Sequence, residues 1–277
     1  MRELTGRGRM GGRILLFLFL AFSLAFFPTA DSSGGDSVIQ WVRRNGPCGG
    51  VINTLVVHPS NPDIAYAGTF RWGTWPNTLG NGVFKTTDGG RTWHRANGAD
   101  GILYGKPINS ITLDPGDPEI LYVLAFPTGI FKSSDGGGSW QKIFAKQNTI
   151  GFGLSESDTN ILYASALQGF NGPLIVYRSG DSGMTWRRAG SVPGTYDGCL
   201  HCLKNIVAVD PHNPDVVFVG TSEGIYKSRN GGQSWEAKSE GLTRRDMKSI
   251  VINPSNSQIV YALTGQEDLE GCFEGDK

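Results

Sequence analysis

Thr86-Thr87-Asp88-Gly89-Gly90-Arg91-Thr92-Trp93 is an eight-residue phrase that recurs through the chain and decides the fold. Three further copies read SSDGGGSW at Ser133–Trp140, SGDSGMTW at Ser179–Trp186 and SRNGGQSW at Ser228–Trp235. Successive copies begin 47, 46 and 49 residues apart. A nearly fixed period of this size indicates repeated supersecondary units, most often the blades of a propeller.

Each copy of the phrase is preceded by the same series of short apolar runs. In the first unit, Leu55–Val57 and Ile64–Thr69 flank a Pro/Asn/Asp turn, and Val83–Lys85 leads into the phrase. The residues after each Trp supply a fourth run, such as Gln141–Phe144. Four antiparallel strands in ~45 residues are typical of a propeller blade. The sequence therefore predicts an all-β propeller with four full blades.

The residue types within the phrase suit a tight turn between the third and fourth strands. Asp and Ser/Thr side chains form hydrogen bonds with the backbone of such turns. The glycine at the fifth position occurs in all four copies and suits a positive φ. The tryptophan supplies a large apolar body for packing between sheets. The expected turn residues are Asp88, Asp135, Asp181 and Asn230, and the expected packing residues are Trp93, Trp140, Trp186 and Trp235.

The pattern Ser/Thr-x-Asp-x-Gly-x-Thr/Ser-Trp resembles the Asp-box, or BNR repeat, of sialidase-like propellers. Exo-sialidases, xyloglucan-cleaving endoglucanases, sortilin-type receptors and photosystem II assembly factors share this repeat. The resemblance covers nearly everything from about Val38 onward, and it implies that the phrase is a structural turn at the blade rim. Asn230 agrees with that role, because asparagine can form a similar turn but cannot act as a carboxylic acid.

After Tyr261 a fifth unit begins, and it stops early. Gly271–Glu274 aligns with the third strand of the other units, and only Gly275-Asp276-Lys277 follow it. One interpretation places Val38–Arg43 as the missing fourth strand, which would close a ring of five blades. The other is that residues 31–277 form a propeller truncated at the C-terminus, and the abrupt loss of the phrase favours this slightly.

Residues 1–30 are typical of a secretory signal peptide. Four arginines precede the uncharged run Ile14–Phe27, which is followed by Pro28-Thr29-Ala30. An apolar run of this length is short for a membrane span, which needs ~20 residues, so we expect no stable span after signal cleavage. An uncleaved anchor is the minority alternative, because Pro28 is a poor residue before a cleavage site. The expected location is secreted or periplasmic.

Composition and cysteine spacing narrow the classes of site. The 25 basic and 25 acidic residues balance, which argues against a nucleic-acid interface. The spacing of the cysteines matches no common zinc or haem motif, so we expect no metal and no cofactor. In an exported chain, disulfides are the expected fate of cysteines, and a Cys48–Cys272 pair is weakly favoured among three possible pairings. The disulfide candidates are Cys48, Cys199, Cys202 and Cys272.

Candidate ligand-binding residues lie in long loops that interrupt the repeat. If the phrase joins strands three and four, then the loops after strands two and four share the opposite face, where function is usual. Residues 70–81 form an insertion with two tryptophans, whereas the same join in the fourth unit is only Ser222-Glu223. Aromatic side chains on such a face suit sugars or a protein loop. The candidates are Trp72, Trp75, Tyr104, Phe170, Tyr196, Asp197 and His201. The alternative is that they only fold their own loops onto the blades.

Residues typical of catalysis in the resembled families are missing from their usual places. The sialidase resemblance implies an Arg-Ile-Pro, which does not occur, and the endoglucanase resemblance implies an Asp where Phe70 stands. Asp197, Glu223, Asp246 and Glu267 are expected on the loop face, but in different units. We therefore assign no catalytic residue and expect an exported, non-catalytic propeller that binds protein or polysaccharide. The alternative is a glycoside hydrolase of the sialidase or xyloglucanase type, or a degenerate relative of one.

Overall fold

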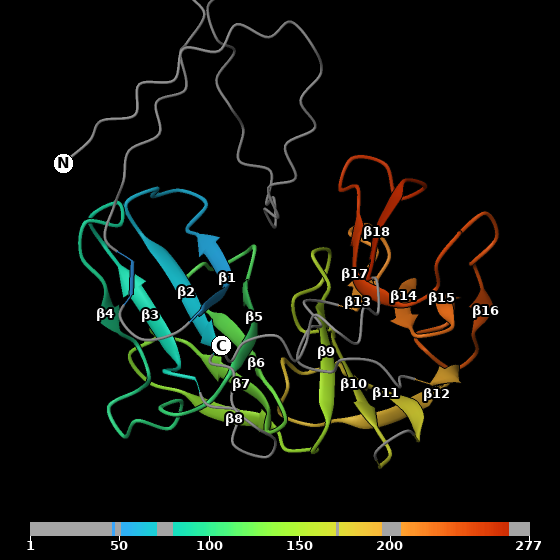
Figure 1. The fold of residues 1–277 in the computed structure, drawn as a ribbon, viewed down its shortest axis with the longest axis horizontal. Helices are drawn as coiled ribbons and strands as arrows, with labels where there is room; N and C mark the ends of the chain where they lie inside the picture. The colour runs from blue at the N-terminus through green and yellow to red at the C-terminus, as the bar shows by residue number, and fades with distance from the viewer. Residues whose placement is uncertain (1–45, 48–50, 71–79, 170–171, 196–205, 266–277) are drawn as a thin grey trace, which may run out of the picture.

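The computed structural model describes residues 46–47, 51–70, 80–169, 172–195 and 206–265, and within these ranges all regular structure is β-strand (Figure 1). Four sheets of four antiparallel strands follow one another along the chain, and a fifth contains two strands. In every sheet the strands pair with their neighbours in sequence order. This is the predicted β-propeller architecture, and the boundaries of its blades follow the period of the phrase.

The blades are numbered here in chain order. Blade 1 comprises β1 (Val51–Val57), β2 (Ala65–Phe70), β3 (Val83–Thr86) and β4 (His94–Arg95). Blade 2 comprises β5 (Ile108–Leu113), β6 (Leu121–Ala125), β7 (Gly129–Ser133) and β8 (Gln141–Phe144). Blade 3 comprises β9 (Thr149–Leu154), β10 (Leu162–Leu167), β11 (Pro173–Ser179) and β12 (Arg187–Thr195). Blade 4 comprises β13 (Val207–Val209), β14 (Val217–Thr221), β15 (Gly224–Ser228) and β16 (Glu236–Ala237). The fifth sheet comprises β17 (Met247–Ile252) and β18 (Val260–Thr264).

Each blade buries its apolar side chains against the next blade. Tyr66 and Val83 of blade 1 pack against Val123 and Phe131 of blade 2 in one cluster of buried residues. Equivalent clusters join blades 2 and 3, blades 3 and 4, and blade 4 with the fifth sheet. A single four-stranded sheet cannot bury both of its faces, so each blade depends on its neighbours for a core.

The four copies of the phrase form the same turn. In the second copy, the backbone N–H of Ser139 donates to Asp135 Oδ1 at 2.8 Å and the Ser139 hydroxyl donates to Oδ2 at 2.6 Å. The backbone N–H of Gly137 donates to Ser133 Oγ at 2.9 Å. In the fourth copy, Asn230 Oδ1 accepts from the Ser234 N–H at 2.9 Å and Asn230 Nδ2 donates to Ser234 Oγ at 2.8 Å. An uncharged side chain thus completes the turn by reversing one donor and acceptor.

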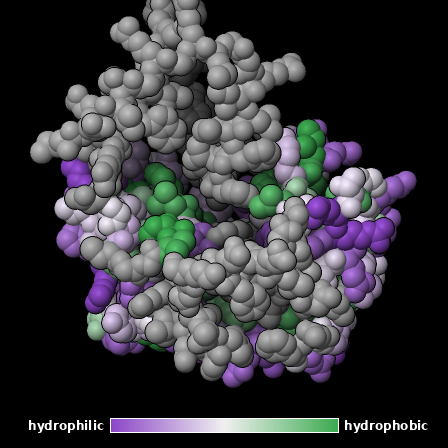
Figure 2. Space-filling view, in the orientation of Figure 1, coloured by the Kyte–Doolittle hydropathy of each residue, from purple (hydrophilic) through white to green (hydrophobic). Residues whose placement is uncertain are grey.

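The five sheets form an arc with two exposed ends (Figure 1). At one end, β1 exposes Val51 and Leu55; at the other, β17 and β18 expose Val251, Tyr261 and Leu263. Figure 2 shows hydrophobic surface at both places. Residues 38–43 and 271–277, on which the two interpretations of ring closure depend, lie outside the described residues. The described part of the chain has no helix long and apolar enough to cross a bilayer.

The phrase turns make folding stability sensitive to acid. Hydrogen bonds from the Thr or Ser four residues later hold the pKa of Asp88, Asp135 and Asp181 below the usual range, to about 2 for Asp135. A carboxylate with a lower pKa in the folded state stabilises the protein above its unfolded pKa, near 4, and loses that contribution as pH falls through the folded value. We therefore expect the free energy of unfolding to fall between about pH 5 and pH 2.

Urea denaturation across that pH range, on the wild type and on D88N/D135N/D181N, measures this contribution. The triple variant should show a shallower loss of stability on acidification, because Asn230 already forms the turn without a titrating group. Equal pH dependence of the two proteins would show that the three aspartates do not carry the effect.

Candidate functional site on the loop face

The turns divide each blade between two edges. The phrase lies at the edge that also carries the turn between the first two strands; in blade 1 the Gly89 N–H donates to the Asp63 carbonyl at 3.0 Å. The joins after the second and fourth strands lie at the opposite edge, which is called the loop face here. Its longest described segment is the 96–107 connection between β4 and β5.

The 96–107 connection is held by buried anchors at its base. The side chain of Asn97 accepts from the Val83 N–H at 2.7 Å and donates to the Asn81 carbonyl at 2.8 Å. Leu103 is completely buried. These contacts fix a loop of irregular backbone against blade 1, so that the side chains at its tip have a defined position.

Tyr104 is the predicted site residue that lies within the described residues. Its side chain is 58% exposed, next to the buried Leu103. The guanidinium of Arg95 lies over its ring, 5.2 Å from the centroid. A ring that is exposed yet supported by a cation offers a surface on which a sugar ring or a peptide could stack.

The base of the insertion at 71–79 lies beside the same loop. The Gly80 N–H donates to the Gly105 carbonyl at 3.2 Å. A Cβ atom at Gly80 would overlap the Lys106 carbonyl, so this close approach requires glycine. Gly80 follows Trp75 by five residues in the sequence. The insertion with the two predicted tryptophans therefore rejoins the described fold next to Tyr104.

Most of the other residues predicted for the loop face lie outside the described part of the chain. Trp72, Trp75, Phe170, Tyr196, Asp197, His201 and Glu267 lie outside the described residues, as do Cys48, Cys199, Cys202 and Cys272. The described ranges contain no group of three His, Cys, Asp or Glu side chains that could hold a metal ion.

An ion pair on the loop face was not predicted from the sequence. Asp246 precedes β17 and contacts Lys248 at 2.7 Å from Oδ2 to Nζ. The two side chains are only 16% and 12% exposed, and both Asp246 carboxylate oxygens are buried. Asp246 immediately precedes β17 and Lys248 lies within it, and no sequence pattern marks an acidic residue at that position as buried. Glu223 is exposed on the β14–β15 turn of blade 4. Asp246 is thus tied to a lysine and is not shown beside a second carboxylate.

The chain is similar in sequence and in fold to xyloglucanases. It is 26% identical over 250 residues to an oligoxyloglucan-reducing end-specific xyloglucanase from Emericella nidulans, a match that covers 81% of this chain and 28% of the relative. No family model matches the chain.

Solved structures with the same fold include two GH74 enzymes. The GH74 enzyme of Niastella koreensis aligns with a TM-score of 0.54 at 25% identity, over 77% of this chain and 35% of that one. The GH74 xyloglucanase of Xanthomonas campestris aligns with a TM-score of 0.56 at 16% identity, over 76% and 35% respectively. The chain therefore spans about a third or less of these relatives. The similarities favour the glycoside hydrolase alternative over the non-catalytic propeller expected from the sequence.

The Asp246–Lys248 pair gives a stability test of the loop face. Replacement of Lys248 by Met leaves a buried, uncompensated carboxylate, and we expect a loss of about 3 kcal/mol in the free energy of unfolding. The double variant D246N/K248M removes both charges and should recover more than half of that loss. Guanidinium denaturation of the two variants checks this, and a double variant as unstable as K248M would show that burial of charge is not the cause.

Proposed function

We propose that this chain is a polysaccharide-binding propeller of the glycoside hydrolase type, with a branched β-glucan such as xyloglucan as its ligand. The observation that carries the proposal is the sequence similarity to a xyloglucanase, which extends over 81% of the chain. The similarity in fold to the GH74 enzyme of Niastella koreensis, at 25% identity, supports it.

The described part of the loop face has the chemistry that such a ligand needs. Sugar rings present C–H faces that stack on aromatic side chains, while their hydroxyls take hydrogen bonds. Tyr104 offers an exposed ring above a fixed loop, with Arg95 beneath it. Trp72 and Trp75 belong to the insertion that rejoins the fold next to Tyr104, and we propose that they extend the same aromatic surface.

Hydrolysis is the second candidate function, and the same relatives favour it. Cleavage of a glycosidic bond generally needs two carboxyl groups ~5–10 Å apart, one as acid and one as base or nucleophile. Asp246 lies on the loop face, buried beside Lys248, and is one candidate for this pair. Asp197, Glu223 and Glu267 are the candidates for its partner.

We propose that the protein acts outside the cytoplasm, because residues 1–30 resemble a signal peptide. N-terminal sequencing of the chain from the culture medium or periplasm should give a start near Asp31. An intact Met1 on protein that stays in the cytoplasm would refute export.

Calorimetric titration with xyloglucan oligosaccharides tests the binding function. The wild type should bind them more tightly than unbranched cello-oligosaccharides. Tyr104→Ala should weaken binding about fivefold, since a stacked aromatic contact contributes about 1 kcal/mol. The double variant W72A/W75A should abolish binding without unfolding. Tyr261→Ala is the matched control, because Tyr261 is 57% exposed but lies on β18, away from the loop face.

The possible outcomes separate the candidate functions. Release of reducing ends from xyloglucan by the wild type, lost in Asp246→Asn, would establish hydrolysis. Binding without release would establish a binding propeller. Failure to bind any β-glucan would refute the proposal and return attention to a protein ligand for the same face.

A further inference from the structure

A cation lies over an aromatic ring on the same face of each complete blade. The ring belongs to the second strand and the cation to the third. The pairs are Tyr66 with Lys85 at 5.2 Å, Tyr122 with Lys132 at 5.5 Å, Tyr163 with Arg178 at 5.9 Å, and Phe218 with Lys227 at 4.7 Å, each measured to the ring centroid. This face of each blade is turned towards the next blade.

In the first two junctions the cation contacts the phrase of the following blade. Lys85 Nζ donates to the Gly136 carbonyl at 3.0 Å, and the Tyr66 hydroxyl donates to the same oxygen at 3.2 Å. Lys132 Nζ lies 3.5 Å from the Ser182 carbonyl. Gly136 and Ser182 both occupy the fourth position of the phrase. The fourth phrase residue is therefore the contact point between successive blades.

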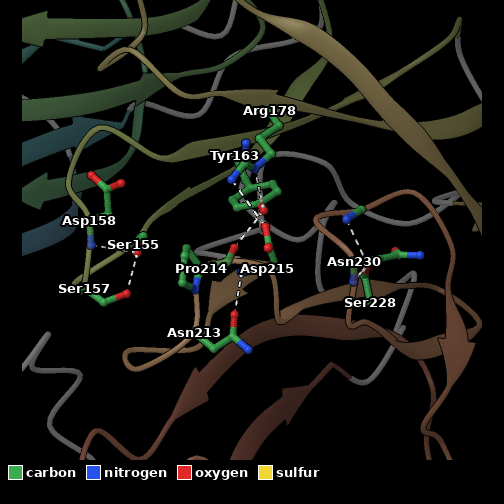
Figure 3. A network of polar contacts seen from close by, with 11 residues as sticks. Ser155, Ser157, Asp158, Tyr163, Arg178, Asn213, Pro214, Asp215, Ser228 and Asn230 are labelled. Atoms are coloured by element: carbon green, nitrogen blue, oxygen red, sulfur yellow. Dashed lines mark hydrogen bonds and ion pairs between the residues drawn. The ribbon is translucent and has the colours of Figure 1, made fainter.

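At the third junction, the cation and the tyrosine contact the turn that is bonded to the fourth phrase residue, rather than that residue itself (Figure 3). Arg178 forms an ion pair with Asp215 at 3.3 Å, and the Tyr163 hydroxyl donates to the Pro214 carbonyl at 2.7 Å. The N–H of Gly231, the fourth phrase residue, donates to the Asp215 carbonyl at 2.9 Å. Arg178 thus contacts the turn that holds the phrase.

At the fourth blade the corresponding position is an open groove. It has a volume of about 660 Å³ and is lined by Phe218, Lys227, Lys238, Leu242 and Gln258, among other residues of blade 4 and the fifth sheet. The equivalent site on blade 1, where Gly136 and its neighbours contact Lys85, leaves only about 240 Å³. The groove therefore occupies the position that, in the first three junctions, is filled by the phrase of the following blade.

The groove displays the groups that hold a phrase in the other blades. Gln258 corresponds in sequence to Asp63, Glu119, Asn160 and Asp215. The carbonyls of those four residues each accept from the fourth phrase residue of their own blade at 2.9 to 3.0 Å. Gln258 lines the groove.

Lys238 supplies a further group of this kind. The Lys238 N–H donates to the Ile225 carbonyl of the third strand of blade 4, just as the Ala96 N–H donates to the Val83 carbonyl in blade 1. In blade 1, the Ala96 carbonyl in turn accepts from the Trp140 indole of the next phrase at 2.8 Å. Lys238 also lines the groove.

Tyr261 of the fifth sheet lies on the face that the other blades turn towards their next neighbour, whereas its neighbours Val260 and Ala262 line the groove. Tyr261 corresponds in sequence to Tyr66, Tyr122, Tyr163 and Phe218. Those four are between 0% and 5% exposed, whereas Tyr261 is 57% exposed.

Within the groove, burial lowers the pKa of Lys227, with Arg229 nearby as the next cause, so a hydrogen-bond acceptor for its ammonium would be stabilising.

We propose that this groove binds a β-hairpin that carries a fifth copy of the phrase. The hairpin would place the carbonyl of its fourth phrase residue against Lys227, the N–H of that residue against the Gln258 carbonyl, and its tryptophan indole against the Lys238 carbonyl. Residues 266–277 contain no copy of the phrase, so the occupant comes from polypeptide other than these residues. The proposal is independent of the polysaccharide function, because the groove lies on the interblade face.

A labelled peptide tests the groove directly. The hairpin Gly129–Phe144 of this chain contains the second phrase and can be synthesised in cyclic form, because an isolated hairpin is only marginally stable. Fluorescence anisotropy should show saturable binding to the full chain. The peptide with alanine in place of its tryptophan should bind at least tenfold more weakly, since a buried aromatic anchor is lost.

A pair of protein variants identifies the site of binding. Lys227→Met should weaken the peptide about fivefold by loss of one charge-assisted hydrogen bond. Lys85→Met is the matched control, because Lys85 already contacts Gly136, and peptide affinity should not change. Equal effects of the two substitutions, or equal binding of both peptides, would overturn the proposal.

A covalent version covers the case in which the free peptide does not adopt a hairpin. The chain extended by the same hairpin sequence after Lys277 should melt at a higher temperature than the chain extended by its tryptophan-to-alanine form. Absence of both peptide binding and this difference refutes the proposal. Light scattering that shows dimers, lost in Lys227→Met and insensitive to the peptide, would assign the groove to a second copy instead.

Discussion

The structure depends on one repeated contact: blades 1 to 3 each hold the phrase of the next blade, or the turn bonded to it, against an aromatic ring and a cation. A sheet of four short strands has two apolar faces and too little area to fold alone. The phrase joins neighbouring blades. Its backbone carbonyl accepts a hydrogen bond from the lysine of the preceding blade, while its own aspartate fixes the turn. A local turn and a long-range contact thus share the same few residues, and the register of one blade sets the position of the next.

The sequence predicted this architecture well, because its determinants are local and recur at a fixed period. The order of strands, the position of the phrase between the third and fourth strands, and the first two strands of the fifth unit all follow from pattern. The contact between Lys85 and Gly136 was not predicted, since it joins residues 51 positions apart that bear no individual signature. It becomes visible only when the blades are placed side by side.

The candidate site was harder to predict for a related reason. Loops that depart from the repeat cannot be interpreted by comparison with the other blades, so their residues were chosen for chemical type alone. Tyr104 is exposed on a well-anchored loop, as a binding residue should be. The Asp246–Lys248 pair escaped prediction, because an acidic residue near a strand start has no pattern that distinguishes a buried carboxylate from a solvated one. Residues that bind a ligand are expected in the loops that depart from the repeat, whereas the sequence similarity to a xyloglucanase extends over 81% of the chain.

Because of Asn230, the turns of the four blades are not equally sensitive to acid. The first three phrase turns depend on carboxylates, whereas the fourth is held by a neutral amide. In a stack whose members interact only with their neighbours, stability is close to a sum of local contributions. Protonation would therefore loosen blades 1 to 3 while the turn of blade 4 persists. The protein would then lose its order from one end, and amide exchange in mild acid would proceed faster in the first three phrases than in the fourth.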